Sequence, residues 1–311
     1  MSKVFLEASH PAFSYNAPLE AVGCKETLGA AVDKTVVAKA FSQAAATYNK
    51  QAEVQQRISS HLLTLLKNGL AQAKMLEPNN NLEASRKFIG GASVVIDLGA
   101  GTGFSLPQLQ VLTKTKEVIA LDLSKAMLSA IPESSSVLSM VADFDSLPLA
   151  ENTADVIFSS MSMQWSNDLA RLVDRLSVVL KSGGVLAFAT LLEGSLPEID
   201  DAWRKVDGSK RSLAHPSHAQ WKAWVDSIAV PLSFEQRTEV QRFSSVQQLL
   251  KSVRDIGAGD HRQNREEAFL GKRNYQAFLE ALSSTAWDES TRSFKLSYSV
   301  LYAVLRNNKT A

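Results

Sequence analysis

Five short apolar segments alternate with helix-like stretches in the middle of the chain, and this alternation restricts the possible folds most. Continuous apolar runs of this length are typical of parallel strands that are buried on both faces. Helix-like sequence lies between them, notably at 125–131 and 168–180. The alternation predicts a parallel sheet with helices on both faces and right-handed crossovers. The five segments are 93–99, 117–124, 136–143, 154–162 and 183–191.

Two amphipathic helices are predicted before the first of these strands. The first begins at about Val36, and apolar residues at three- and four-residue steps continue its face as far as Tyr48. The second runs from about 52 to 70. Residues 1–34 show no such period and contain several prolines and glycines, so we expect a loose leader.

The pattern changes again after Leu192. Residues 198–228 and 245–283 are predicted helices, and about 229–243 and 293–306 are predicted strands. The fold expected is α/β: a doubly wound, mostly parallel seven-stranded sheet with an N-terminal helical lid and a helical insertion before the last strands. The expected division is a leader (1–34), a lid (35–80) and a main domain (81–311), with a ligand-binding core (90–192) and a substrate- and partner-facing region (193–290).

Composition excludes several classes of protein. The chain has 311 residues and 45% are hydrophobic, which fits a folded globular protein. No stretch approaches the roughly 20 apolar residues of a membrane span, and the first residues do not resemble a secretion signal. The single cysteine forms no intrachain disulfide, and the net charge of +1 argues against broad nucleic-acid binding. We therefore expect a cytoplasmic protein with no membrane or nucleic-acid partner.

A glycine-rich loop follows the first predicted strand, in the sequence Asp97-Leu98-Gly99-Ala100-Gly101-Thr102-Gly103. Glycines allow a tight turn and close approach to a ligand. The nicotinamide-binding pattern needs a small residue where Phe104 stands, and the Gly-Lys-Ser/Thr ending of a P-loop is absent. A structural turn without a ligand remains the other interpretation of the loop alone.

Acidic residues at the ends of the next two strands favour a ligand. Asp122 ends the second strand and is placed to accept hydrogen bonds from both ribose hydroxyls of an adenosine. Asp143 ends the third strand, where a carboxylate can meet the adenine amino group. Together with Asp97, these residues place three carboxylates on the carboxyl edge of the sheet, where open α/β sheets bind ligands.

The set DLGAGTG, ALDLS and ADFDSLP resembles the class I S-adenosylmethionine-dependent methyltransferases over about residues 85–192. The resemblance implies S-adenosylmethionine as cofactor. It also implies one role for each matching residue. Asp97, Gly99, Gly101 and Gly103 would hold the methionine part, Asp122 the ribose and Leu123 the adenine; Asp143 and Phe144 would line the adenine pocket, and Ser159 would close the methyl-donor end.

A narrower resemblance covers about 270 residues. Five segments, in the right order, are similar to the malonyl-acyl-carrier-protein O-methyltransferases of biotin synthesis (the BioC type). They are FSQAAATYNKQAEVQ (41–55), MSMQWSNDL (161–169), LLEGSLPEIDDAW (191–203), DIGAGDH (255–261) and KLSYSVLYAVL (295–305). The match is poor after Ala258, and the leader is longer than the family pattern.

The narrower resemblance implies methyl transfer to the free carboxylate of a malonyl thioester, carried by acyl-carrier protein or coenzyme A. Such a carboxylate is ionised at neutral pH and needs no general base. Neither a Ser/His/Asp set nor a metal-ligand spacing is evident in the sequence. The candidate residues around the acceptor are Tyr48 on the lid, Gln164 and Trp165 after strand four, Arg254 (with Arg265 a weaker choice) for the carboxylate, and Tyr298 on the last strand.

An acyl-carrier protein would be acidic, so a basic docking patch is expected. Two candidates are the group Arg204, Lys205, Lys210 and Arg211 and the group Arg262, Arg265, Lys272 and Arg273. Two other functions stay open at this point. One is a methyltransferase of the same fold acting on another small acid or a quinone precursor. The other is a non-methylating assembly scaffold, which the intact Asp and Gly set disfavours.

Overall fold

The computed structural model describes residues 31–75, 94–133, 136–255 and 272–308. Its centre is one sheet with the strand order β3-β2-β1-β4-β5-β8-β6. The strands β1 to β5 pair in parallel, and β8 runs antiparallel to β5 and β6. The strands are β1 (Val95–Leu98), β2 (Val118–Asp122), β3 (Val137–Val141), β4 (Ala154–Ser160), β5 (Leu180–Leu191), β6 (Ala229–Phe243), β7 (Trp287–Asp288) and β8 (Ser293–Asn307).

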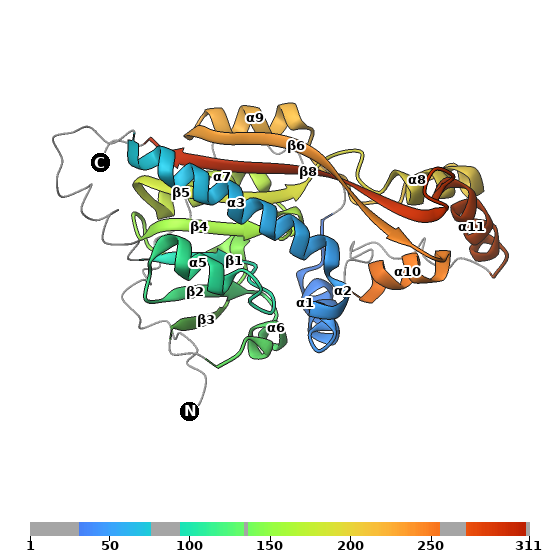
Figure 1. The fold of residues 1–311 in the computed structure, drawn as a ribbon, viewed down its shortest axis with the longest axis horizontal. Helices are drawn as coiled ribbons and strands as arrows, with labels where there is room; N and C mark the ends of the chain where they lie inside the picture. Colours follow the sequence, from blue (N-terminus) through green and yellow to red (C-terminus); the bar gives the residue numbers. More distant parts are fainter. Residues whose placement is uncertain (1–30, 76–93, 134–135, 256–271, 309–311) are drawn as a thin grey trace.

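The predicted doubly wound sheet is confirmed by this order and by helices on both faces (Figure 1). The seven strands of the main path correspond to the seven predicted. The expected number was one too low, because the two-residue strand β7 adds an eighth strand by pairing with Ser293 and Phe294 of β8. Two residues are too few to show a period in the sequence.

Two apolar layers sandwich the sheet. One face packs against α3 and α5, with Val54, Ile58 and Leu62 among its buried residues. The other face packs against α7 and α9, with Leu176 and Trp221. The helices are α1 (Lys34–Ala44), α2 (Tyr48–Gln51), α3 (Glu53–Met75), α5 (Leu106–Thr113), α6 (Lys125–Ala130), α7 (Leu169–Val179), α8 (Pro197–Asp207), α9 (His218–Asp226), α10 (Val246–Asp255) and α11 (Lys272–Thr285), with 3-10 turns η1 (Phe144–Ser146) and η2 (Met163–Trp165).

The first predicted helix is in fact two. It was expected to continue to Tyr48, but α1 ends at Ala44 and Tyr48 opens the four-residue helix α2. A turn separates them, closed by a hydrogen bond from the Thr47 amide to the Ala44 carbonyl (2.9 Å). No glycine or proline marks this break in the sequence, so the apolar spacing concealed it. The break redirects α2 toward the carboxyl edge of the sheet.

Strands β6 and β8 are 15 residues each and extend well beyond β5. Figure 1 shows them as a two-stranded ribbon that reaches a small helical lobe made by α8, α10 and α11. The lobe is held by a stack of Trp203 on Phe278 (centroids 4.2 Å apart), with the Arg211 guanidinium 4.2 Å from the Trp203 ring. The predicted helical insertion is thus a lobe attached to the last two strands.

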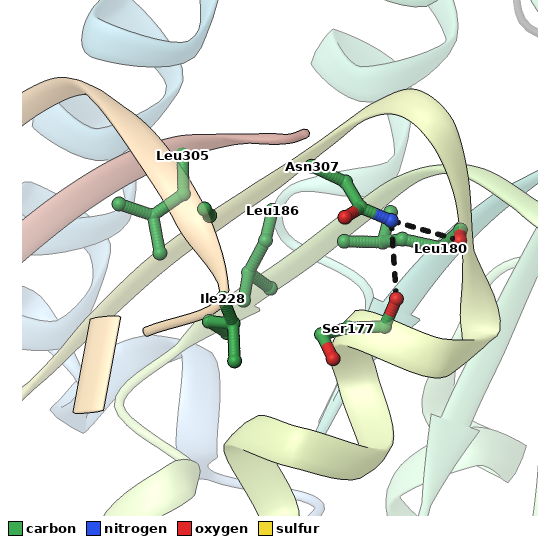
Figure 2. Close-up of a pocket in the computed structure, with 7 residues that line it drawn as sticks. Ser177, Leu180, Leu186, Ile228, Leu305 and Asn307 are labelled. Carbon is green, nitrogen blue, oxygen red and sulfur yellow. Dashed lines mark hydrogen bonds between the residues drawn. The ribbon is translucent and has the colours of Figure 1, made fainter. Parts of the chain in front are cut away.

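A small cavity lies at the opposite edge of the sheet from the strand ends that carry the acidic residues. Leu180, Leu186, Ile228, Ala229 and Leu305 are among its lining residues (Figure 2). The Asn307 amide closes it by donating to the carbonyls of Ser177 and Leu180, both at 3.1 Å. Its lining is mainly aliphatic, and the Asn307 amide is bonded to neighbouring backbone carbonyls. We therefore interpret the cavity as a gap in the packing and not as a ligand site.

Gly69 on α3 tests the packing of this layer. An added Cβ there would lie 2.5 Å from Cγ1 of the buried Val304 on β8. Overpacking of this kind costs ~1–3 kcal/mol, whereas glycine-to-alanine in a helix gains about 1 kcal/mol. We expect Gly69→Ala to lower the free energy of unfolding by about 1 kcal/mol in urea denaturation, and Lys67→Ala, at an exposed position on the same helix, to change it little. A Gly69→Ala protein more stable than the wild type would contradict the close approach of α3 to β8.

Candidate active site

The glycine loop joins β1 to α5 and lies between the ends of β2 and β4. The amides of Gly99 and Ala100 donate to the Leu121 carbonyl at 2.7 and 2.9 Å. Gly99 has φ +76°, and a Cβ there would collide with Ser162 at 2.3 Å, so only glycine fits. Gly101 has φ +54° and nothing within 4 Å of an added Cβ. The loop therefore leaves open space at its middle glycine.

Asp122 points its carboxylate into this loop. Oδ2 accepts a hydrogen bond from the Gly101 amide (2.9 Å), and Oδ1 accepts one from the Ser124 amide (2.8 Å). Burial raises the pKa of the carboxyl, and these backbone donors lower it in part. A carboxylate has about four acceptor sites, so capacity for a further donor remains. The predicted ribose-binding role of Asp122 stays a prediction, and it requires a carboxylate at this loop.

Asp97 ends β1 beneath the same loop and is 2% exposed. Its Oδ2 accepts a hydrogen bond from the Ser105 hydroxyl, a contact the sequence analysis missed. Burial raises the pKa of Asp97 to about 7, the Ser105 bond lowers it, and the nearby Asp122 raises it further. Two neighbouring carboxyls with raised pKa values form a site that favours a cationic ligand, because a positive charge stabilises both ionised forms.

The end of β3 is held by a residue that the sequence did not single out. Lys34 of α1 lies 3.1 Å from Asp143 and 2.9 Å from Asp145, and its ammonium is 4.3 Å from the centre of the Phe144 ring. The Asp143 carboxylate also caps η1 by accepting from the Asp145 amide (3.0 Å). Phe144 itself is buried, and Leu123, at the end of β2, is half-buried. The predicted adenine-side residues therefore lie together, under the first helix of the lid.

Ser159 lies behind the loop. It is fully buried, and its hydroxyl donates to the Leu98 carbonyl (3.0 Å) and bonds Ser162 (2.7 Å), which itself donates to Leu98 (2.8 Å). The two serines tie the end of β4 to the end of β1. In this position Ser159 supports the glycine loop from within.

Residues of α1 and α2 cover the carboxyl edge. Tyr48 is half-buried; burial raises the pKa of its phenol, and the negative charge of Asp122 raises it further. Asn49 accepts a hydrogen bond from the Thr102 hydroxyl on the loop (2.6 Å), another contact that no sequence signal marked. Phe41 bridges Tyr48 and Trp165, with ring centroids 6.3 and 5.8 Å away. The lid and the glycine loop are thus in direct contact.

The remaining candidates are dispersed. Gln164, on η2 beside Trp165, donates to the Met161 carbonyl (2.7 Å) and accepts from Thr190. Arg254 is exposed near the end of α10, a helix that packs against α2. Tyr298 is buried on β8; burial and the charge of Glu198 raise its pKa, and Arg57 lowers it. Arg265 lies outside the described residues.

The donor set fits S-adenosylmethionine. The buried Asp97, the half-buried Asp122, an open glycine and an apolar edge suit a ligand that has ribose hydroxyls, an ammonium group and a sulfonium group. Within the described ranges, no group of three or more His, Cys, Asp or Glu side chains has the arrangement of a metal site. The same ranges hold no helix with the length and apolarity to cross a membrane.

Comparison with known proteins identifies the family. A model of the methyltransferase domain matches residues 96–188. The malonyl-[acyl-carrier protein] O-methyltransferase of Pectobacterium atrosepticum is 31% identical over 277 residues, covering 88% of this chain and 96% of that protein. The chain belongs to the malonyl-[acyl-carrier protein] O-methyltransferase family. The family member of Serratia marcescens is 30% identical over 272 residues, covering 87% of this chain and 96% of its own length.

A third relative is longer. The biotin biosynthesis bifunctional protein BioHC of Cellvibrio japonicus is 31% identical over 283 residues, and the chain spans 51% of its length. The resemblance read from the sequence is confirmed by these relatives, and so is a methyltransferase that uses S-adenosylmethionine. The individual residue roles stay predictions that rest on the geometry above.

The Asp97 carboxyl makes stability depend on pH. Its pKa is about 7 in the folded protein against an ordinary 3.8. Between these two pH values the carboxyl is protonated in the folded protein and ionised in the unfolded chain, so unfolding releases a proton. The folded state therefore loses stability from about pH 4 to pH 7, and the loss is complete above that range. We expect Asp97→Asn to raise the free energy of unfolding by ~1–3 kcal/mol at pH 8, with a smaller gain at pH 5.5, and to abolish binding of S-adenosylmethionine.

Urea denaturation at the two pH values and calorimetry with the cofactor measure both effects. The matched control is Asp201→Asn on the exposed surface of α8, for which no difference between the two pH values is expected. An equal stability change for Asp97→Asn at pH 5.5 and pH 8 would show that this carboxyl does not titrate in the range.

Proposed function

We propose that this protein transfers the methyl group of S-adenosylmethionine to the free carboxylate of a malonyl thioester, giving its methyl ester. The observation that carries the proposal is the match to malonyl-[acyl-carrier protein] O-methyltransferases, which covers 88% and 87% of this chain and 96% of each of two relatives. The Asp97 and Asp122 carboxyls at the glycine loop supply the site for the methyl donor. A carrier-bound malonyl group is the preferred acceptor, and the product belongs to biotin synthesis.

The reaction needs positioning more than proton transfer. The attacking carboxylate is already ionised at neutral pH, so no general base is required. The raised pKa of Tyr48 keeps its phenol protonated, which suits a cover or a hydrogen-bond donor and not a base. Alignment of the carboxylate oxygen with the methyl group and sulfur is worth up to ~7–11 kcal/mol. The side chains of this chain contribute by fixing that line and by excluding water.

The lid supplies the exclusion of water. Phe41, Trp165 and the Tyr48 ring make a continuous aromatic cover from α1 to η2. A carboxylate stripped of water is a stronger nucleophile toward a sulfonium methyl group, because loss of hydration raises the energy of the charged reactants more than that of the less polar transition state. In this proposal Gln164 positions η2 through the Met161 carbonyl, and Tyr298 supports the wall on the ribbon side.

The direct test is incubation of the protein with methyl-labelled S-adenosylmethionine and malonyl-acyl-carrier protein. We expect one base-labile methyl ester per carrier, detected by mass and by loss of label in mild base. Succinyl-carrier protein is the control, since its carboxylate lies one methylene farther from the thioester. Methylation of other small acids with no transfer to the malonyl thioester would overturn the proposal.

We further propose that the carrier protein docks near the start of α11. The alternative patch on α8 is balanced by acids: Arg204 pairs with Asp201, and Arg211 pairs with Asp207 at 2.6 Å. A third cation of this patch, Lys210, lies 3.8 Å from Asp200. Lys272 and Arg273 open α11 with no acid in its first turn, and Arg273 is exposed. Arg262 and Arg265, the other members of this patch, lie outside the described residues.

Charge reversal separates the two patches. We expect Arg273→Glu to raise KM for malonyl-acyl-carrier protein several-fold while KM for malonyl-coenzyme A changes little, because repulsion acts only on the acidic carrier. Lys205→Glu on the α8 patch serves as the matched exposed control, with a smaller effect. Equal losses with both acceptors for Arg273→Glu would contradict docking at α11.

A further inference from the structure

Two buried polar atoms on the α3 face of the sheet lack hydrogen-bond partners among the described residues. They are Oε1 of Gln55, in the first turn of α3, and Oγ of Ser160, the last residue of β4. Buried polar groups are almost always bonded, since an unpaired one costs the full desolvation penalty. Unpaired buried atoms near a ligand site are candidates for hydrogen bonds to the ligand.

Gln55 sits next to the junction of the lid and the glycine loop. The neighbouring side chain of Gln56 donates to the backbone carbonyl of Asn49 (2.9 Å), and the Asn49 side chain accepts from Thr102 of the loop. The residues that flank Gln55, Val54 and Ile58, are fully buried against the sheet. The first turn of α3 is therefore fixed both to the lid and to the face of the sheet.

Ser160, the last residue of β4, lies on the same face of the sheet. Side chains alternate along a strand, so Ser160 shares a face with Val156 and Phe158, which lie in the same apolar cluster as Val54 and Ile58. Its neighbour Ser159 turns the other way and bonds the Leu98 carbonyl beneath Gly99. The following residue, Met161, has φ +56°, a backbone strain of the kind that gathers at functional sites.

We propose that Gln55 and Ser160 bind the acceptor carboxylate, an inference that rests on the proposed function. A hydroxyl donates one hydrogen bond, and a side-chain amide presents either its oxygen or its N–H₂ by rotation about one bond. With the Gln55 amide turned so that its N–H₂ group stands where Oε1 now lies, each residue offers one donor to the acceptor. Gln55 comes from α3 and Ser160 from the end of β4, which lies on the other side of β1 from β2 and Asp122.

Neutral donors suit this reaction better than an arginine. The carboxylate loses its charge as the ester forms, so a guanidinium paired with it would be left buried and unpaired beside the product. A guanidinium would also lower the nucleophilicity of the oxygen. Amide and hydroxyl groups remain adequate partners for the ester carbonyl. This assignment is an alternative to the predicted role of Arg254, which is exposed near the end of α10.

The test compares equilibrium binding of malonyl and acetyl thioesters of the same carrier protein, measured by calorimetry on the full chain with S-adenosylhomocysteine present. The acetyl group lacks the carboxylate. Gln55→Leu and Ser160→Ala are each expected to weaken malonyl binding by ~10-fold or more and to leave acetyl binding within twofold. The affinity for S-adenosylmethionine should be unchanged. Melting temperatures should not fall, since each change removes an unsatisfied buried atom.

Matched controls lie on α3. Gln72→Leu and Ser60→Ala are exposed changes of the same types, and both should bind malonyl-carrier protein as the wild type does. Gln55→Asn should recover part of the preference for malonyl over acetyl. Variants that keep the full wild-type preference would overturn the inference alone. A wild-type protein that binds the two thioesters equally and methylates neither would overturn the proposed function itself.

Discussion

The hydrogen bond from the Gly101 amide to Asp122 is the constraint on which the site depends. It joins the end of β2 to the middle of the loop after β1, and it requires the left-handed backbone that Gly101 adopts at φ +54°. Without it, a carboxylate desolvated by burial would lose one of its backbone donors, and the middle of the loop would lose its bond to the end of β2. Asp97 lies beneath the same loop and is influenced by Asp122. The fold thus concentrates two acidic groups at one point and leaves their charges for a cationic ligand to balance.

The lid extends this constraint outward through several independent polar contacts. The first contact is made just before α1 by the backbone of Val32, which donates to the Asn167 side chain at 2.7 Å and accepts from it at 3.1 Å. Further contacts join Lys34 to Asp143, Ser42 to Ser124 (2.8 Å) and Asn49 to Thr102. They reach the loops after β1, β2, β3 and β4 in turn. Each contact is individually weak, so the position of the lid depends on several of them together.

Local patterns explain why the core was predictable. Apolar strand runs, the glycine loop and the acidic strand ends are features of adjacent residues, so β1 to β5 and the positions of Asp97 and Asp122 followed from sequence. Lys34 and Asn49 did not, because their partners are distant in sequence: Lys34 meets Asp143 109 residues away, and Asn49 meets Thr102 53 residues away. Gln55 and Ser160 did not either, because the burial of an unpaired polar atom is visible only in the folded structure. The break before Tyr48 was missed for a related reason, since α2 is held by Gln56 and the glycine loop and not by a turn residue.

The distribution of charge around the site follows from the chemistry. Transfer of a methyl group from a sulfonium to a carboxylate removes one positive and one negative charge, so the transition state is less polar than the reactants. Apolar surroundings therefore raise the energy of the reactants more than that of the transition state. The residues proposed for the acceptor side meet this demand: Phe41, Trp165 and Met163 are aromatic or aliphatic, and Gln55 and Ser160 are neutral. The carboxyls proposed to hold the methyl donor, Asp97 and Asp122, lie at the glycine loop. A positively charged group on the acceptor side would stabilise the free carboxylate and slow its attack, so a neutral acceptor side and an acidic donor side are two consequences of one reaction.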